Sequence, residues 1–156
     1  MTPETLAALH ARSMDVPGPW SACEFADLLA SPGAFLAKPP QDLPTLRGKG
    51  PDDASLRFHG FALGRVAADE AELLTIAVDH RHRRQGIGSA CRAAFEAEAR
   101  SRGAARAFLE VAVTNEAALR LYLAAGWSGH GCRKAYYRTR SGHVDAILMS
   151  KCLADT

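Results

Sequence analysis

Near the start of the chain, hydrophobic positions follow the spacing of two helices and one short strand. Leu6 and Leu9 fall on one face of a helix predicted over residues 3–14, which has a proline in its first turn. A second helix, with three spaced apolar residues, is predicted to follow Ser21. The apolar run at 33–37 then predicts a strand.

In the middle of the chain, the pattern becomes that of a hairpin followed by a long helix. Residues 58–67 and 71–78 predict two strands joined by a turn at Asp69 and Glu70. Apolar residues then recur at helical spacing over 86–102, and a glycine follows that segment. We therefore expect an antiparallel pair that leads directly into a helix.

The last third of the chain predicts a strand, a helix and a final hairpin. Residues 105–113 are mostly apolar and favour a strand covered on both faces. A helix is predicted over 116–125 with Asn115 as its cap, and residues 127–137 and 144–152 predict an antiparallel pair. This order mixes hairpins with a strand–helix–strand crossover, which is typical of an α+β fold with a mixed sheet.

Length and composition indicate one globular unit. The chain has 156 residues, so 1–156 is predicted to form a single domain. Its 47% hydrophobic and 23% charged residues exclude wholesale disorder. Prolines and glycines concentrate within residues 38–57, which we expect to form a flexible loop. Apolar runs fall far short of the roughly 20 residues that span a bilayer, and no signal pattern opens the chain, so we expect cytoplasmic localisation and no membrane partner.

Charge and cysteine usage narrow the class of ligand. A net charge of +2 is too small to predict a nucleic-acid partner. The four cysteines are scattered, which favours buried reduced thiols over a metal site. His80 and His82 alternate beside Asp79 in a basic turn, and a solvated turn is the simpler interpretation of that group. We expect no metal.

The clearest chemical pattern is the segment 73–89, LLTIAVDHRHRRQGIGS. A predicted strand ends there in a basic turn, and Gly86 and Gly88 open the next helix. Free N–H groups at a helix N-terminus bind phosphate oxygens, and glycines let a diphosphate approach the backbone. The spacing alone leaves a solvated basic loop as the alternative, because it matches neither the Walker pattern nor the dinucleotide fingerprint.

The run Arg83-Arg84-Gln85-Gly86-Ile87-Gly88 resembles the acetyl-CoA motif of the GCN5-related N-acetyltransferases (GNAT). Within that superfamily, the chain is similar to the RimI-type ribosomal-protein alanine N-acetyltransferases in four ordered segments. These segments are Pro19-Trp20-Ser21, residues 71–89, and stretches within residues 109–127 and 136–149. The resemblance implies the GNAT fold, in which helices flank a mostly antiparallel twisted sheet.

The resemblance also implies acetyl-CoA as the cosubstrate. Matched position by position, the resemblance implies that the strand end at residues 76–78 contacts the acetyl and pantetheine arm through backbone groups. It also implies that residues 84–89, the end of the basic turn and the helix start, hold the diphosphate. Asn115 is implied to bind the pantetheine side. The implied cofactor-binding residues are Ile76, Ala77, Val78, Arg83, Arg84, Gln85, Gly86, Ile87, Gly88, Ser89 and Asn115.

The same resemblance makes Glu110 the general base and Tyr122 the general acid. Near pH 7.4, neutralising an attacking α-amine of pKa about 7.8 costs about 0.5 kcal/mol, against about 4 kcal/mol for a lysine, so one carboxylate suffices. A phenol can protonate the departing thiolate. The residues alone leave open a solvent-facing or salt-bridged Glu110 and a core Tyr122.

Three aromatic residues are candidates for the acceptor site. Trp20 shapes that site or fills the core, and Tyr136 and Tyr137 line a peptide channel or pair across the last hairpin; the sequence favours neither alternative. The proline-rich stretch 38–53 gates the site or is only slack in the chain.

Taken with the resemblance, the sequence implies an N-α-acetyltransferase that acts on the N-terminal alanine of a small-subunit ribosomal protein. The implied reaction is direct attack by the amine in a ternary complex. One alternative is a GNAT enzyme that acetylates lysine, polyamine or another small-molecule amine. Another is a non-catalytic acyl-CoA-binding sensor module, which would bind acetyl-CoA without turnover. No sequence pattern indicates an oligomeric state.

Overall fold

The computed structural model describes residues 2–13, 18–40, 59–80 and 86–154. Every predicted helix and strand is present there, with ends that differ from the predicted ones by at most two residues. Most of the predicted loop 38–57 lies outside the described residues. The elements are α1 (Pro3–Ser13), α2 (Ala22–Ala30), β1 (Ala34–Ala37), β2 (Gly60–Ala67), β3 (Glu70–Val78), α3 (Ile87–Ser101), β4 (Arg106–Ala112), α4 (Glu116–Ala124), β5 (Ser128–Thr139) and β6 (Gly142–Cys152).

Polar side chains mark the starts of two helices. Ser21 accepts a hydrogen bond from the Glu24 N–H at the start of α2, and the Glu24 carboxylate accepts one from the Ser21 N–H in return. This reciprocal pair satisfies two backbone donors that the helix itself leaves unpaired. Asn115 caps α4 in the same sense, because its Oδ1 accepts from the Ala118 N–H at 3.2 Å.

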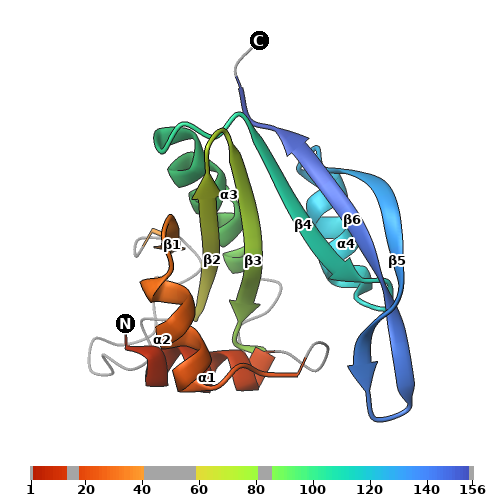
Figure 1. Cartoon of the computed structure of the whole chain (residues 1–156). Coiled ribbons are helices and arrows are strands. Elements are labelled where there is room, and N and C mark those ends of the chain that lie inside the picture. Colours follow the sequence, from red (N-terminus) through yellow and green to blue (C-terminus); the bar gives the residue numbers. More distant parts are fainter. Residues whose placement is uncertain (1, 14–17, 41–58, 81–85, 155–156) are drawn as a thin grey trace.

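The strands form one sheet in the order β1-β2-β3-β4-β6-β5. All neighbours are antiparallel except β3 and β4, which α3 connects as a parallel pair. This confirms the mixed, mostly antiparallel sheet. Figure 1 shows the strands side by side, with the long β5–β6 hairpin at the far edge from β1.

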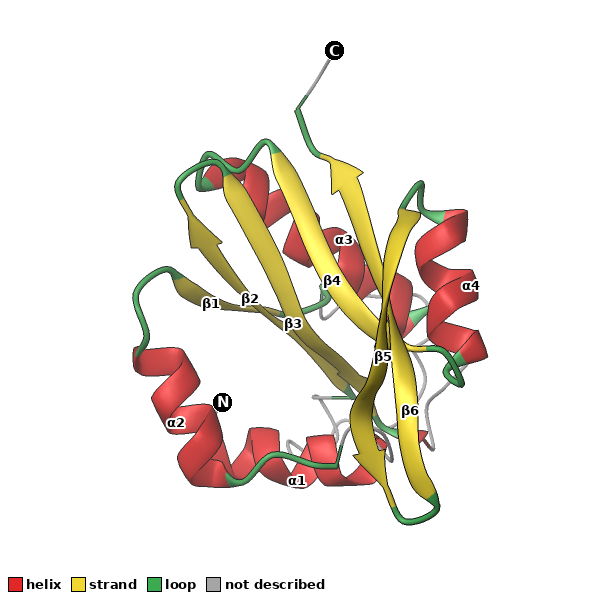
Figure 2. Cartoon of the chain, turned by 45° about the vertical axis from the view of Figure 1, so that its right-hand side comes forward, coloured by secondary structure: helices red, strands yellow, loops and turns green. Residues whose placement is uncertain are grey.

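Helices cover both faces of the sheet and enclose two hydrophobic clusters. Leu6, Leu9 and Phe25 of α1 and α2 pack on one face. Phe95 of α3 and Tyr122 of α4 pack on the other. Figure 2 shows α1 and α2 well apart from α3, with the sheet between them. The sheet therefore separates two chemically distinct sides of the molecule.

A β-bulge in β3 changes which residues face each side. Leu63 of β2 pairs with Thr75, whereas the next residue, Gly64, pairs with Leu73, so Leu74 is an extra residue in β3. Simple alternation is lost at this point. As a result, Leu73 and Ile76, three residues apart, both pack on the α3 side.

The expectation that all four cysteines are buried is wrong for three of them. Cys91 is fully buried on the inner face of α3, and burial raises the pKa of its thiol to about 12. Cys23, Cys132 and Cys152 are exposed. They lie in the first turn of α2, on the edge strand β5 and at the last residue of β6, where little packs over them. All four are free thiols, as predicted.

Candidate active site

The candidate site lies where the two parallel strands move apart. β3 and β4 are paired only from Glu70 and Arg106 to Glu72 and Phe108, and they diverge beyond these residues (Figure 1). A cavity of about 510 Å³ lies in this region, with walls from β3, β4, α4 and the start of α3. The slot between β3 and β4 therefore brings together segments far apart in the sequence.

Most of the site residues implied by the sequence line this cavity. Ala77 does not, because its side chain packs into the α1–α2 cluster. Arg83, Arg84 and Gln85 lie outside the described residues. The implied residues in the cavity wall are Trp20, Ile76, Val78, Gly86, Ile87, Gly88, Ser89, Glu110, Asn115, Tyr122 and Tyr137.

α3 begins in the cavity wall without a capping side chain. Gly86 has a φ of 79°, a left-handed conformation that glycine adopts without strain. The Ala90 N–H donates back to the Gly86 carbonyl, so the N–H groups of Ile87, Gly88 and Ser89 precede the first bond of the helix. These three residues line the cavity. Backbone donors and the positive end of the helix dipole thus favour an anionic group here.

The wall beside this helix start has no room for an extra side chain. A Cβ atom at Gly88 would lie 3.0 Å from Leu121 Cδ1 and 3.7 Å from Val78 Cγ2. Asn115 contributes from the start of α4. Because its Oδ1 caps the helix, its Nδ2 group is the donor that the side chain can offer to a ligand.

Tyr122 reaches the cavity from α4 on the same side of the sheet as α3. It is buried, and its ring packs against Trp127 with centroids 5.8 Å apart. Burial raises the pKa of the Tyr122 hydroxyl above its usual value. The phenol is protonated at neutral pH, as an ordinary tyrosine also is, so its hydrogen is available to a group in the cavity. Tyr122 is at once a core residue and part of the cavity wall.

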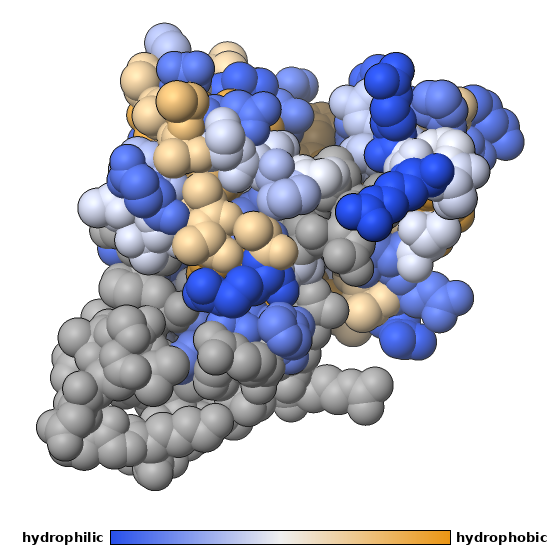
Figure 3. All heavy atoms as spheres, turned by 90° about the horizontal axis from the view of Figure 1, so that it is seen from below, coloured by the Kyte–Doolittle hydropathy of each residue, from blue (hydrophilic) through white to orange (hydrophobic). Residues whose placement is uncertain are grey.

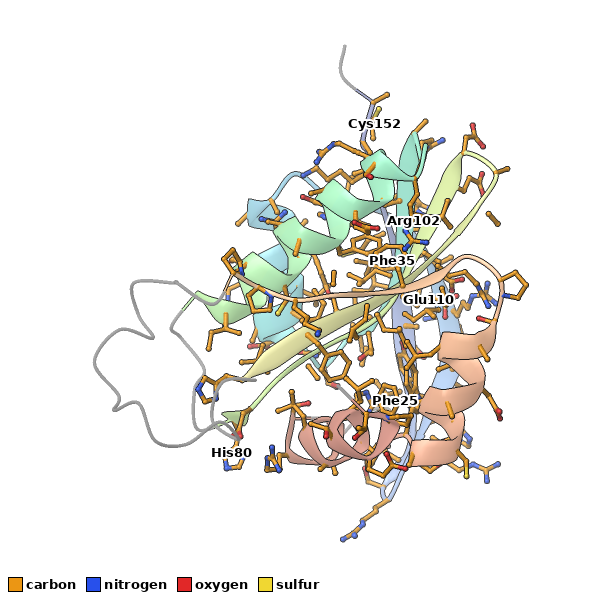
Figure 4. The ribbon with its side chains drawn as sticks, turned by 90° about the vertical axis from the view of Figure 1, so that its left-hand side faces the viewer. Phe25, Phe35, His80, Arg102, Glu110 and Cys152 are labelled. Carbon is orange, nitrogen blue, oxygen red and sulfur yellow. The ribbon has the colours of Figure 1, made fainter. Side chains whose placement is uncertain are left out.

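Glu110 lies on the opposite face of the sheet. Leu109 and Val111 pack on the α3 side, so alternation along β4 directs Glu110 to the side of α1 and α2, as Figure 4 shows. Its carboxylate forms an ion pair with Arg133 Nε at 2.9 Å. The Tyr136 hydroxyl hydrogen-bonds to the same carboxylate, which raises the pKa of Tyr136. Glu110 is thus salt-bridged, as one interpretation of the sequence had it, and also lines the cavity.

The two tyrosines near the end of β5 do not play equivalent parts. Tyr137 lines the cavity, and burial raises its pKa to about 12. Tyr136 is exposed, with its ring 4.9 Å from that of Tyr137. Trp20 both lines the cavity and packs against Phe25, with ring centroids 5.4 Å apart. Each of the three therefore contacts the cavity or its carboxylate.

Sequence reasoning missed several polar residues at this site, among them Arg133 and Thr75. Arg133 contacts Glu110 from β5, although β6 lies between their strands. Thr75 lines the cavity, and the bulge in β3 determines the face on which its side chain lies. Neither position has a local pattern that marks it, because both depend on strand register.

Other classes of site find little support in the described part of the chain. In those ranges no three His, Cys, Asp or Glu side chains come together as metal ligands. His80 instead contacts the Arg12 carbonyl oxygen through Nδ1 at 2.9 Å. No helix in the same ranges is long and apolar enough to cross a bilayer.

Comparisons with known proteins agree with this geometry. The model of the acetyltransferase (GNAT) family matches residues 11–127. The [ribosomal protein bS18]-alanine N-acetyltransferase of Escherichia coli K12 is 42% identical over 94 residues, which cover 60% of this chain and 64% of that protein. The match therefore spans somewhat less than two thirds of the relative's length.

Two solved structures share the fold. The crystal structure of the ribosomal-protein-S18-alanine N-acetyltransferase from Escherichia coli has a TM-score of 0.80 and 28% identity, covering 99% of this chain and 89% of that chain. That of Arabidopsis thaliana NAA60 in complex with acetyl-CoA has a TM-score of 0.77 at 17% identity, covering 96% and 92%. The family match over most of the chain and the shared architecture show that the chain belongs to the acetyltransferase (GNAT) family.

Proposed function

We propose that this protein transfers the acetyl group of acetyl-CoA to the N-terminal α-amine of a protein, with an N-terminal alanine of a small-subunit ribosomal protein as the acceptor. One observation carries the proposal: Glu110 and Tyr122 come from opposite faces of the sheet and line one cavity in the slot between β3 and β4. The name of the 42% identical relative supports the choice of acceptor.

The described residues fit acetyl-CoA at the start of α3. The uncapped N–H groups of Ile87, Gly88 and Ser89 suit the diphosphate, and the absence of a side chain at Gly88 lets the helix start pack closely against Leu121. Bound acetyl-CoA supplies a thioester whose carbonyl carbon is open to attack by an amine. The contribution of the basic turn, Arg83 to Gln85, stays a prediction.

Glu110 and Tyr122 divide the proton transfers between them. The α-ammonium group of the acceptor loses a proton to Glu110, directly or through water, and the neutral nitrogen attacks the acetyl carbonyl carbon. The carbon–sulfur bond then breaks, and Tyr122 gives its proton to the departing sulfur. The second proton leaves the attacking nitrogen and returns to the Tyr122 phenolate, so the products are a neutral amide and a thiol. Both residues line the same cavity, so neither proton has to cross the sheet.

The experiment compares two matched peptides with acetyl-CoA, read by mass spectrometry. One has a free N-terminal alanine and no lysine; the other has a blocked N-terminus and one internal lysine. We expect acetylation of the first alone. Acetylation of the second alone would replace the proposal with a side-chain acetyltransferase, and acetyl-CoA binding without modification of either would indicate a sensor module.

A further inference from the structure

A histidine that the proposed chemistry does not use is fully buried beside the slot. His10, on the inner face of α1, is 0% exposed. Its ring stacks on Trp20 with centroids 4.9 Å apart and an interplanar angle of 23°. Its two nitrogens contact Trp20 and Thr75, which both line the cavity. The imidazole therefore joins two parts of the cavity wall.

The hydrogen bonds of His10 determine which atoms carry hydrogen. The Trp20 backbone N–H can only donate, so Nδ1 of His10, 3.0 Å away, is the acceptor. Burial lowers the pKa of His10 to about 4, so the ring is neutral at physiological pH and carries its single hydrogen on Nε2. Nε2 therefore donates to Thr75 Oγ1 at 3.2 Å. The hydroxyl hydrogen of Thr75 is then directed away from the imidazole.

Thr75 places its hydroxyl in the cavity wall on the α1 side of the sheet. The bulge at Leu74 places Thr75 on the α1 side of the sheet, the side on which Glu110 also lies. The side chain is only 7% exposed and lines the cavity. The start of α3, which suits the diphosphate, is on the other side. On the α1 side, a notch separates α1 and α2 from the β5–β6 hairpin (Figure 3).

We infer that the Thr75 hydroxyl donates a hydrogen bond to the first main-chain carbonyl oxygen of the acceptor, and that His10 is the positioning residue that orients it. The inference rests on the proposed function. In a peptide, that carbonyl is the hydrogen-bond acceptor nearest to the reacting α-amine. The carbon that bears a lysine ε-amine carries no such group. The contact therefore selects α-amines over lysine side chains.

The test pairs two enzyme variants with two acceptors. Thr75→Val removes the hydroxyl and keeps the shape, and Thr75→Ser restores it. The acceptors are an N-terminal alanine peptide and the same peptide with a trans-alkene in place of its first amide, which lacks the carbonyl oxygen. We expect Thr75→Val to raise the KM for the amide peptide by about 3- to 10-fold, the effect of one neutral hydrogen bond. The KM for the alkene peptide and for acetyl-CoA should stay unchanged, and Thr75→Ser should behave as wild type.

The role of His10 is tested by combining His10→Phe with Thr75→Val. If His10 acts through Thr75, the two increases in KM do not add. The inference is wrong if Thr75→Val leaves the KM of the amide peptide unchanged, or raises the KM of both peptides equally, since either result makes the hydroxyl structural only. If the wild-type protein acetylates no α-amine at all, the proposed function fails, and the inference falls with it.

Discussion

Glu96 is a buried carboxylate that hydrogen-bonds to side chains next to Tyr122, the proposed general acid. This carboxylate on α3 is only 4% exposed. It accepts hydrogen bonds from Arg92, from Trp127 Nε1 at 2.9 Å and from Lys151 Nζ at 2.9 Å. The ring of Trp127 in turn packs on Tyr122. One side chain therefore ties α3 to β6 and to the residue that precedes β5.

We expect Glu96→Ala to lower the free energy of unfolding by about 3–5 kcal/mol, because it leaves buried cations without a counter-charge. The Arg92 and Lys151 side chains are only 16% and 20% exposed, so water replaces the carboxylate poorly. A matched control lies on the same helix. Glu98 pairs with Arg102 at the same four-residue spacing, but both side chains are more than 40% exposed. Glu98→Ala is therefore expected to change the stability by less than about 1 kcal/mol.

The assay is urea denaturation at pH 7, followed by circular dichroism, with all three proteins measured side by side. Equal slopes of free energy against urea would show that the unfolding reaction is the same in each. The prediction is refuted if the losses in free energy of unfolding for Glu96→Ala and Glu98→Ala differ by less than about 1 kcal/mol. Burial would then make no difference to how much an ion pair contributes to stability.

The remaining predictions concern the cavity. Tyr122→Phe is expected to lower kcat about 100-fold with acetyl-CoA binding retained; an unchanged kcat in steady-state assays would show that the phenol protonates nothing. Gly88→Val is expected to raise the KM for acetyl-CoA about tenfold, because a Cβ there already lies 3.0 Å from Leu121 Cδ1. A larger effect on the KM for the peptide would contradict this placement. The buried neutral His10 has a pKa lowered from 6.5 to about 4. Its contribution to the free energy of unfolding is therefore complete above pH 6.5 and decreases as the pH falls toward 4. The free energy of unfolding is expected to fall by at most about 1.4 kcal/mol per pH unit in this range, because only the unfolded state takes up the proton. Urea denaturation at pH 7, 6 and 5 measures it, and His10→Gln, which does not titrate, should lack that component.

Local patterns made the elements and the helix start predictable. Ser21 and Asn115 carry side chains that cap helices, and the structure places them at the starts of α2 and α4. Gly86 takes a positive φ that glycine tolerates best, and it opens α3 as its place in the motif implies. In each case, the information lies within a few residues along the chain.

The surroundings of the carboxylate were not predictable, because they depend on two irregularities in strand pairing. β5 shifts register between Arg133 and Tyr137, and Ala135 within this bulge has a φ of 51°. Its N–H donates to Asp145 Oδ1 at 2.7 Å, which stabilises the bulge and lowers the pKa of Asp145. Alanine is not a residue that indicates a left-handed position, so nothing local predicts that Arg133 reaches Glu110.

No local sequence pattern marks the bulge in β3 either. Residues 71–78 predict a strand with no interruption, whereas Leu74 is an inserted residue that changes the face of Thr75. The partner of Thr75, His10, lies 65 positions earlier in the chain. Only the three-dimensional arrangement connects these residues, and so the hydrogen-bonded group beside the slot escaped sequence reasoning.

The role of Glu110 as the catalytic base is tested most directly by the kcat of Glu110→Gln with an N-terminal alanine peptide and acetyl-CoA. This change removes the base while preserving the size of the side chain. We expect kcat to fall at least about 100-fold with an unchanged KM for acetyl-CoA. Glu98→Gln, remote from the cavity on α3, should retain wild-type activity. A kcat for Glu110→Gln close to that of Glu98→Gln would contradict the claim that the slot carries the catalytic base.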